Sequence, residues 1–63
     1  MNNPLVTKAL QGRTSAESAW DLVLVLGKSG NRRAKVWEEI KARAPEAVRL
    51  LVETHLKEMG RPL

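Results

Sequence analysis

The sequence predicts an all-α protein, a small bundle of three to four short helices in a single domain spanning residues 1–63. Apolar residues recur at spacings of three and four positions along most of the chain, as on one face of a helix. Start and stop residues divide the chain into four expected helices, at about 4–11, 15–27, 31–43 and 45–59. Residues 22–26 have the composition of a buried strand, but no second strand candidate could pair with them, so a helix is favoured.

The first expected helix, residues 4–11, begins with Asn3 as its N-cap and Pro4 at the first helical position. Gly12 is expected to end it. Its apolar residues lie on one side, at Leu5, Val6, Ala9 and Leu10. A helix this short is marginal in water by itself, so it must dock on another element.

The second expected helix, residues 15–27, begins with a capping box formed by Thr14 and Glu17. On a helical wheel its apolar residues form an arc of roughly 200°, made up of Ala16, Ala19, Trp20, Leu22, Val23, Leu24 and Leu26. Val25 falls outside this arc, among the polar residues. So wide an arc needs packing on two sides, either by the other helices or by a second copy of the chain.

The third and fourth expected helices follow two interruptions of the pattern. Gly27 and Gly30 separate residues 31–43 from the preceding helix, and Ser29 or Asn31 can cap the new one. Pro45 starts the helix 45–59, and Gly60 ends it. The expected apolar stripes are Ala34, Trp37, Ile40 and Ala44 on the third helix, and Val48, Leu51, Val52, His55, Leu56 and Met59 on the fourth.

Small size points to association. A chain of this length removes only about 60% of its unfolded surface from water, and small domains often gain stability from disulfides, a metal or a partner subunit. The sequence has no cysteine and one histidine, which leaves association. Together with the wide arc of the second helix, this predicts a homodimer, with self-association through Trp20, Leu22, Val25 and Leu26.

The net charge of +4 is concentrated in the first part of the chain. Residues 1–37 contain six basic and two acidic side chains, whereas residues 38–63 contain five of each. Such an asymmetry favours partners with acidic surfaces, nucleic acid or membrane headgroups.

The basic stretch at 28–35 is the main candidate site. It combines a helix start with guanidinium and ammonium groups, an arrangement that suits anions. We expect it to bind a protein partner or an anion through Lys28, Asn31, Arg32, Arg33 and Lys35. The alternatives are that it contacts the phosphates of a nucleic acid, with contributions from Lys8 and Arg13, or that it is a solvated loop.

Motifs for chemistry are lacking in the sequence. A helix-turn-helix fits poorly, because either choice of turn glycine puts a charged residue, Arg33 or Glu39, at an inward position. A P-loop would need glycine where Leu22 stands. His55 lacks a second histidine or a cysteine with which to share a metal, and no paired carboxylates present themselves. We therefore expect no cofactor, no metal site and no enzymatic activity.

The function expected from the sequence is that of a non-enzymatic small helical binding protein: an adaptor, regulator or inhibitor of a protein partner with an acidic surface. It would use its helix faces and the basic loop. A nucleic-acid-binding module is the alternative. With no signal peptide at the start and no apolar run near the roughly 20 residues that a membrane helix needs, we expect a cytoplasmic protein that does not bind a membrane.

Overall fold

The computed structural model describes residues 3–11 and 13–60, and every regular element in these residues is helical. The elements are α1 (Pro4–Leu10), α2 (Ser15–Gly27), the 3₁₀ turn η1 (Gly30–Arg32), α3 (Arg33–Arg43) and α4 (Glu46–Glu58). The all-α class predicted from the sequence is therefore confirmed.

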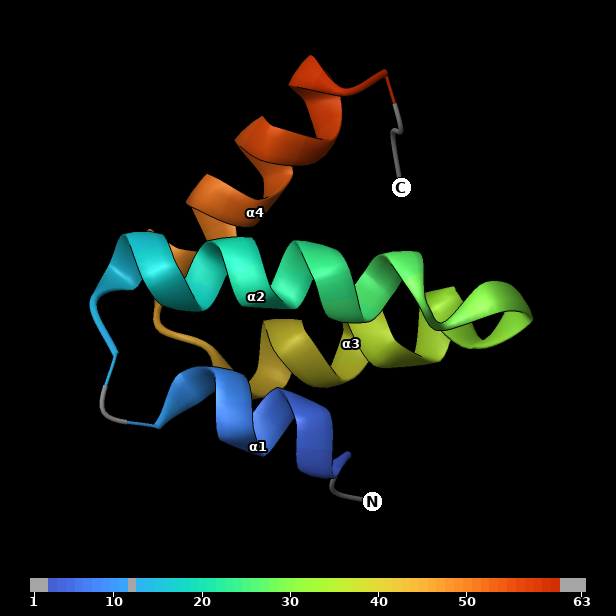
Figure 1. Cartoon of the computed structure of the whole chain (residues 1–63), viewed down its shortest axis with the longest axis horizontal. Coiled ribbons are helices and arrows are strands. Elements are labelled where there is room, and N and C mark those ends of the chain that lie inside the picture. The colour runs from blue at the N-terminus through green and yellow to red at the C-terminus, as the bar shows by residue number, and fades with distance from the viewer. Residues whose placement is uncertain (1–2, 12, 61–63) are drawn as a thin grey trace.

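Helix α2 is the centre of the fold. It runs across the middle of Figure 1, with α1 and α3 below it and α4 above it in that view. Each of the other three helices packs against α2. The chain itself therefore covers α2 on more than one side.

The starts of α1 and α2 follow the sequence prediction. Asn3 caps α1, because its side-chain oxygen accepts a hydrogen bond from the amide of Leu5 at 2.9 Å. Thr14 and Glu17 form the capping box: the Glu17 amide donates to the Thr14 hydroxyl at 3.2 Å, and the Thr14 amide donates to the Glu17 carboxylate at 3.1 Å. The hydrogen bonds from Thr14 lower the pKa of Glu17. The predicted stop at Gly12 lies outside the described residues.

The turn between α2 and α3 differs from the prediction. The Ser29 hydroxyl donates to the Val25 carbonyl at 2.7 Å, so it closes α2 instead of capping the next helix. Gly30 has the positive φ of 57°, which glycine adopts without steric cost. Residues 30–32 then form η1, so α3 begins at Arg33 and has no side-chain cap at its N-terminus.

Proline and glycine set the limits of α4. Ala44 is extended, as expected before a proline, and Pro45 is the N-cap instead of the first helical residue. Beyond the helix, Gly60 has a φ of 68°, and its amide donates to the Lys57 carbonyl at 3.1 Å. This is the left-handed ending that the sequence predicts.

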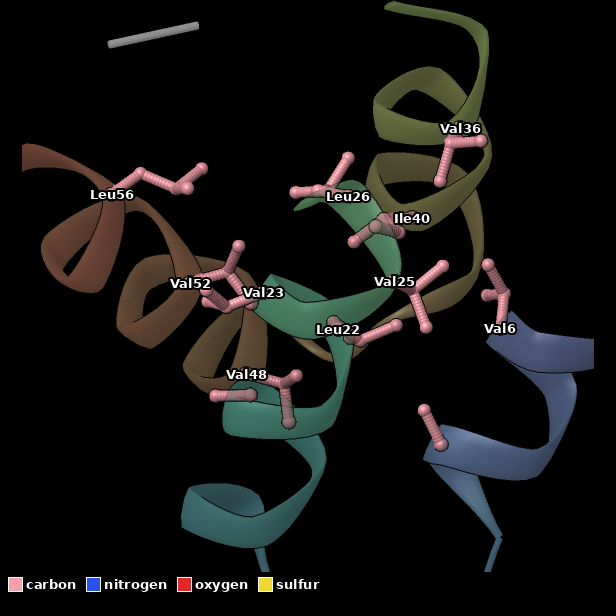
Figure 2. Packing of buried hydrophobic residues seen from close by; sticks show 12 residues of the cluster. Val6, Leu22, Val23, Val25, Leu26, Val36, Ile40, Val48, Val52 and Leu56 are labelled. Carbon is pink, nitrogen blue, oxygen red and sulfur yellow. The ribbon is translucent and has the colours of Figure 1, made fainter. Parts of the chain in front are cut away.

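The core is one cluster of small and medium aliphatic side chains (Figure 2). Val6 of α1, Ile40 of α3 and Val52 of α4 approach α2 from different sides in this view. The cluster consists of Val6, Ala9, Ala19, Leu22, Val23, Val25, Leu26, Val36, Ile40, Val48, Val52 and Leu56. On α3 the buried pair is Val36 and Ile40; Trp37 is half-buried and Ala34 is exposed, so the stripe predicted there is rotated.

Helix α2 is likewise rotated relative to the prediction. Val25, which the wheel placed among the polar residues, is buried, and so is the polar Ser18. Trp20 and Leu24, which the wheel assigned to the core, are 48% and 46% exposed. The rotation follows from α1, whose docking buries the side of α2 that carries Val25. It leaves two large apolar side chains at the surface.

A polar network joins α1 to α3. The Glu39 carboxylate accepts a hydrogen bond from the amide of Asn3 at 2.7 Å and pairs with the Arg43 guanidinium at 2.7 Å. Arg43 in turn donates to the Thr7 hydroxyl at 2.6 Å. The amide of Asn3 is the main cause of a lowered pKa for Glu39, with Arg43 contributing in the same direction. These bonds fix a helix of only seven residues.

Candidate functional site

The exposed apolar residues of α2 form the starting point of the site. Trp20 and Leu24 are four positions apart and therefore neighbours on one helix face. Met59, just beyond α4, and Leu5 of α1 are also among the large exposed apolar residues of the chain. The two hollows described below bring all four side chains together around Leu24.

A hollow of about 400 Å³ lies between the second half of α2, the turn that follows it and the end of α4. In Figure 1 α4 diverges from α2 toward its C-terminal end. The residues that line the hollow come from these two helices and from the turn after α2. Most of its wall is apolar, formed by Trp20, Val23, Leu24, Leu26, Leu56 and Met59. Lys28 and Arg33 supply its basic groups. It is therefore suited to receive an apolar group that has negative charge nearby.

The indole ring of Trp20 is held on one side of this hollow. It makes an edge-to-face contact with the His55 imidazole, with ring centroids 5.5 Å apart and an interplanar angle of 77°. The contact joins α2 to α4 and limits the orientations that the exposed ring can adopt.

A second hollow of about 250 Å³ lies on the other side of Leu24, between α1 and α2. Leu5, Ala9 and Val25 supply apolar atoms. Its charged residues are Lys8, Arg13, Asp21 and Lys28. Asp21 pairs with Arg13 at 2.8 Å. Leu24 therefore stands as a ridge with a hollow on each side.

We call this region the Leu24 surface. Its apolar residues are Leu5, Trp20, Leu24 and Met59, and its basic residues are Lys8, Arg13, Lys28 and Arg33. Asp21 is the one acidic residue that lines either hollow, and it is already paired with Arg13. The charge excess seen in the first part of the sequence is thus partly gathered around exposed apolar side chains.

The basic residues predicted from the stretch 28–35 are divided by the structure. Lys28 and Arg33 line the larger hollow. Asn31, Arg32 and Lys35 are exposed but do not line it. The predicted anion-binding set is therefore not gathered into one pocket.

The residues predicted for self-association are also divided. Leu22, Val25 and Leu26 belong to the core of the chain, where a second copy could reach them only if the helices separated. Trp20 is exposed and belongs to the Leu24 surface. Of these four residues, Trp20 is therefore the one that another molecule could contact in the folded chain.

Leu5, Leu24 and Met59 were missed as surface residues because helical spacing alone assigns them to the core. The polar residues Ser18 and Asp21 do not mark the solvent-facing side of α2, because Ser18 is buried and Asp21 is only half-exposed. If the position of α1 against Val25 were known, the helical wheel would predict that Leu24 lies at the surface.

Features of other site classes are lacking in the described part of the chain. Residues 3–11 and 13–60 hold no group of three or more histidine, cysteine, aspartate or glutamate side chains that could bind a metal ion. None of the helices in these ranges has both the length and the hydropathy required to cross a membrane.

Comparisons of this chain with protein-family models, curated proteins and solved structures found no match. What the protein does is therefore inferred from its own residues.

Proposed function

We propose that this protein is a non-enzymatic binding module, an adaptor, regulator or inhibitor, which docks a protein partner through the Leu24 surface. The observation that carries the proposal is the combination of four exposed apolar side chains with four basic ones around two adjoining hollows. Contiguous apolar patches with a polar rim are typical of protein-binding sites.

The size of the molecule is compatible with this role. A standard protein interface buries about 800 Å² on each partner. The whole molecule exposes 4393 Å², so such an interface would cover about one fifth of it. The Leu24 surface draws on α1, α2, the turn and the end of α4, and a partner seated on all of them would cover one side of the protein.

Nucleic acid is the alternative partner. Lys28, Arg32, Arg33 and Lys35 could contact phosphates, and Trp20 could stack on a base. The apolar lining beside Lys28 and Arg33 favours a protein, because phosphates gain nothing from leucine and methionine side chains. The test below distinguishes the two.

Self-association, which the sequence predicts, would use the same exposed side chains. An isologous dimer brings the same patch of both copies together. Here that would bring two basic rims into contact, and like charges facing each other across an interface oppose association. The partner that we propose is therefore another protein with acidic groups, in the cytoplasm as expected from the sequence.

Affinity capture from the native host tests the proposal. Proteins captured by the tagged wild type and by the Leu24→Ala and Leu50→Ala variants would be compared by mass spectrometry, with and without nuclease treatment of the lysate. Leu50 is the matched control, since it is an exposed leucine on α4, 51% exposed against 46% for Leu24, and lines neither hollow.

We expect a protein that wild type and Leu50→Ala retain and that Leu24→Ala loses. Equal capture by all three forms would show that the Leu24 surface does not bind the partner. Loss of capture after nuclease treatment would favour the nucleic-acid alternative.

A further inference from the structure

The shape and charge of the two hollows of the Leu24 surface restrict what can fill them. We propose that the Leu24 surface binds an amphipathic α-helix whose apolar stripe is flanked by carboxylate side chains. This inference rests on the proposed function and specifies the chemistry of the partner.

The shape of the surface suits a helix. Trp20, Leu24 and Lys28 form a row with i, i+4, i+8 spacing along α2, with a hollow on each side of Leu24. Helices pack by placing the ridge of one into the groove of another, and rows of residues four apart are such ridges. The row is about 12 Å long, which corresponds to about two turns of a partner helix.

The backbone of the occupant gives a second reason. A peptide that binds as an added β-strand pairs its amides and carbonyls with an exposed sheet edge. Residues 3–11 and 13–60 contain only helices, turns and loops, so an extended occupant would face apolar side chains with unpaired polar groups. A helix satisfies these groups internally and presents only its side chains.

The charges specify the flanks of that helix. Lys8, Arg13 and Lys28 line the hollow next to α1, where Arg13 also pairs with Asp21, and Lys28 and Arg33 line the other. Glutamate or aspartate side chains beside the apolar stripe could reach these groups. A partner with lysines at the same places would be repelled.

Two other occupants fit less well. A lipid bilayer binds a broad surface from which apolar side chains protrude. Here there is a hollow on each side of Leu24, which suits side chains inserted by a partner. A second copy of this chain would present the same basic rim. Both remain as outcomes of the test.

Synthetic peptides test the proposal on the full chain. A helical peptide of about 18 residues would carry leucines at i, i+3, i+4 and i+7 with glutamates on both flanks. A second peptide would replace the glutamates with lysines, and a third would have the composition of the first with its leucines scrambled. Binding is measured by fluorescence anisotropy of labelled peptides and mapped by amide chemical-shift changes.

We expect the glutamate peptide to bind at least about tenfold tighter than the lysine peptide at low salt, with the gap narrowing as salt rises. The scrambled peptide should bind weakly. Shift changes should concentrate at Trp20, Leu24, Lys28 and Met59. Leu24→Ala should weaken binding about fivefold or more, and Leu50→Ala should leave it unchanged.

Charge reversal provides the sharper comparison. Lys28→Glu should reduce the preference for glutamate over lysine flanks, whereas Lys57→Glu should not. Lys57 is a matched control, because it is exposed, lies near the C-terminal end of its helix as Lys28 does, and lines neither hollow. Both substitutions change the net charge equally.

Several outcomes would overturn the proposal. These are equal binding of the glutamate and lysine peptides, equal binding of the scrambled peptide, or tighter Leu24-dependent binding to duplex DNA or phosphatidylglycerol vesicles. Leu24-dependent dimerisation in sedimentation experiments, with no peptide binding, would identify the occupant as a second copy.

The two proposals can fail separately. If no peptide binds but capture of the native partner still depends on Leu24, the helical acidic occupant is wrong and the binding module stands. If the Leu24→Ala variant also captures the native partner as well as the wild type does, both proposals are wrong.

Discussion

Helices α1 and α4 cover different sides of α2, and they are held there by different means. The short α1 buries Val6 and Ala9 and is also tied to α3 through the bonds among Asn3, Glu39, Arg43 and Thr7. The longer α4 contributes three buried aliphatic side chains, at Val48, Val52 and Leu56. A seven-residue helix offers too little apolar surface to be fixed by burial alone, so polar bonds complete its docking. On the other side α4 diverges from α2 and leaves a hollow at the surface.

The largest effect on stability should come from weakening the apolar contacts that hold α4 against α2. Leu56→Ala removes a buried side chain of α4, and we expect it to lower the free energy of unfolding by about 2 kcal/mol. This is the low end of the usual range, because Leu56 borders the hollow and neighbouring side chains can relax into the space. Urea denaturation followed by circular dichroism measures the change. Because no charge is involved, the loss should be the same at low and high salt, and a strong salt dependence would contradict the apolar docking of α4.

The polar side should respond differently. Glu39→Gln removes the charge that joins Asn3 and Arg43, and we expect a loss of about 1 to 1.5 kcal/mol at low salt. The loss should shrink as salt screens the ion pair. Glu38→Gln is the matched control, because Glu38 forms an exposed ion pair with Lys41 and its replacement should cost less than about 0.5 kcal/mol. Equal effects of the two substitutions would show that the network does not hold α1.

The stability contributions on the two sides of α2 should also differ in their dependence on pH. Because the amide of Asn3 lowers the pKa of Glu39 below its ordinary 4.5 in the folded state, this group stabilises the fold above the ordinary value. That contribution is lost as the pH falls through the lowered pKa of the folded state. The difference in unfolding free energy between wild type and Glu39→Gln should therefore be largest above pH 4.5 and disappear in stronger acid. A difference that stays constant with pH would contradict this account, whereas the effect of Leu56→Ala should show no such pH dependence.

A smaller effect on stability is expected from the capping box of α2, the helix against which both α1 and α4 pack. Thr14→Ala should cost about 1 kcal/mol, since it leaves the amide of Glu17 without its side-chain acceptor. Ser15→Ala, at the next and exposed position, should cost little. Thermal unfolding of the two variants side by side measures the difference. If Ser15→Ala costs as much as Thr14→Ala, the hydroxyl of Thr14 is not the capping group.

The smallest effect on stability is expected at the Leu24 surface itself. Leu24→Ala removes an exposed side chain and should change the free energy of unfolding by less than about 0.5 kcal/mol. The same denaturation experiment checks this, and a near-native result ensures that lost binding reflects the surface and not the fold. A loss near that of Leu56→Ala would mean that Leu24 supports the packing of α2.

The sequence by itself determined the helices of this protein and most of their ends. The residues that begin or end these helices bond to neighbours within a few positions, so their roles follow from local chemistry. They are Asn3, Thr14, Glu17 and Gly60. Of the stripe predicted for α4, Val48, Val52 and Leu56 are buried, whereas Leu51 and Met59 are exposed.

Only the tertiary structure decided which part of the wide apolar arc of α2 faces inward. That choice depends on where α1 docks, and α1 is fixed by the contact of Asn3 with Glu39, two residues separated by 36 positions. Because no local pattern reports such a contact, the sequence could not show that Val25 is buried while Trp20 and Leu24 are exposed. The candidate binding surface exists for the same reason: a helix with more apolar surface than its neighbours can cover leaves the remainder exposed to solvent.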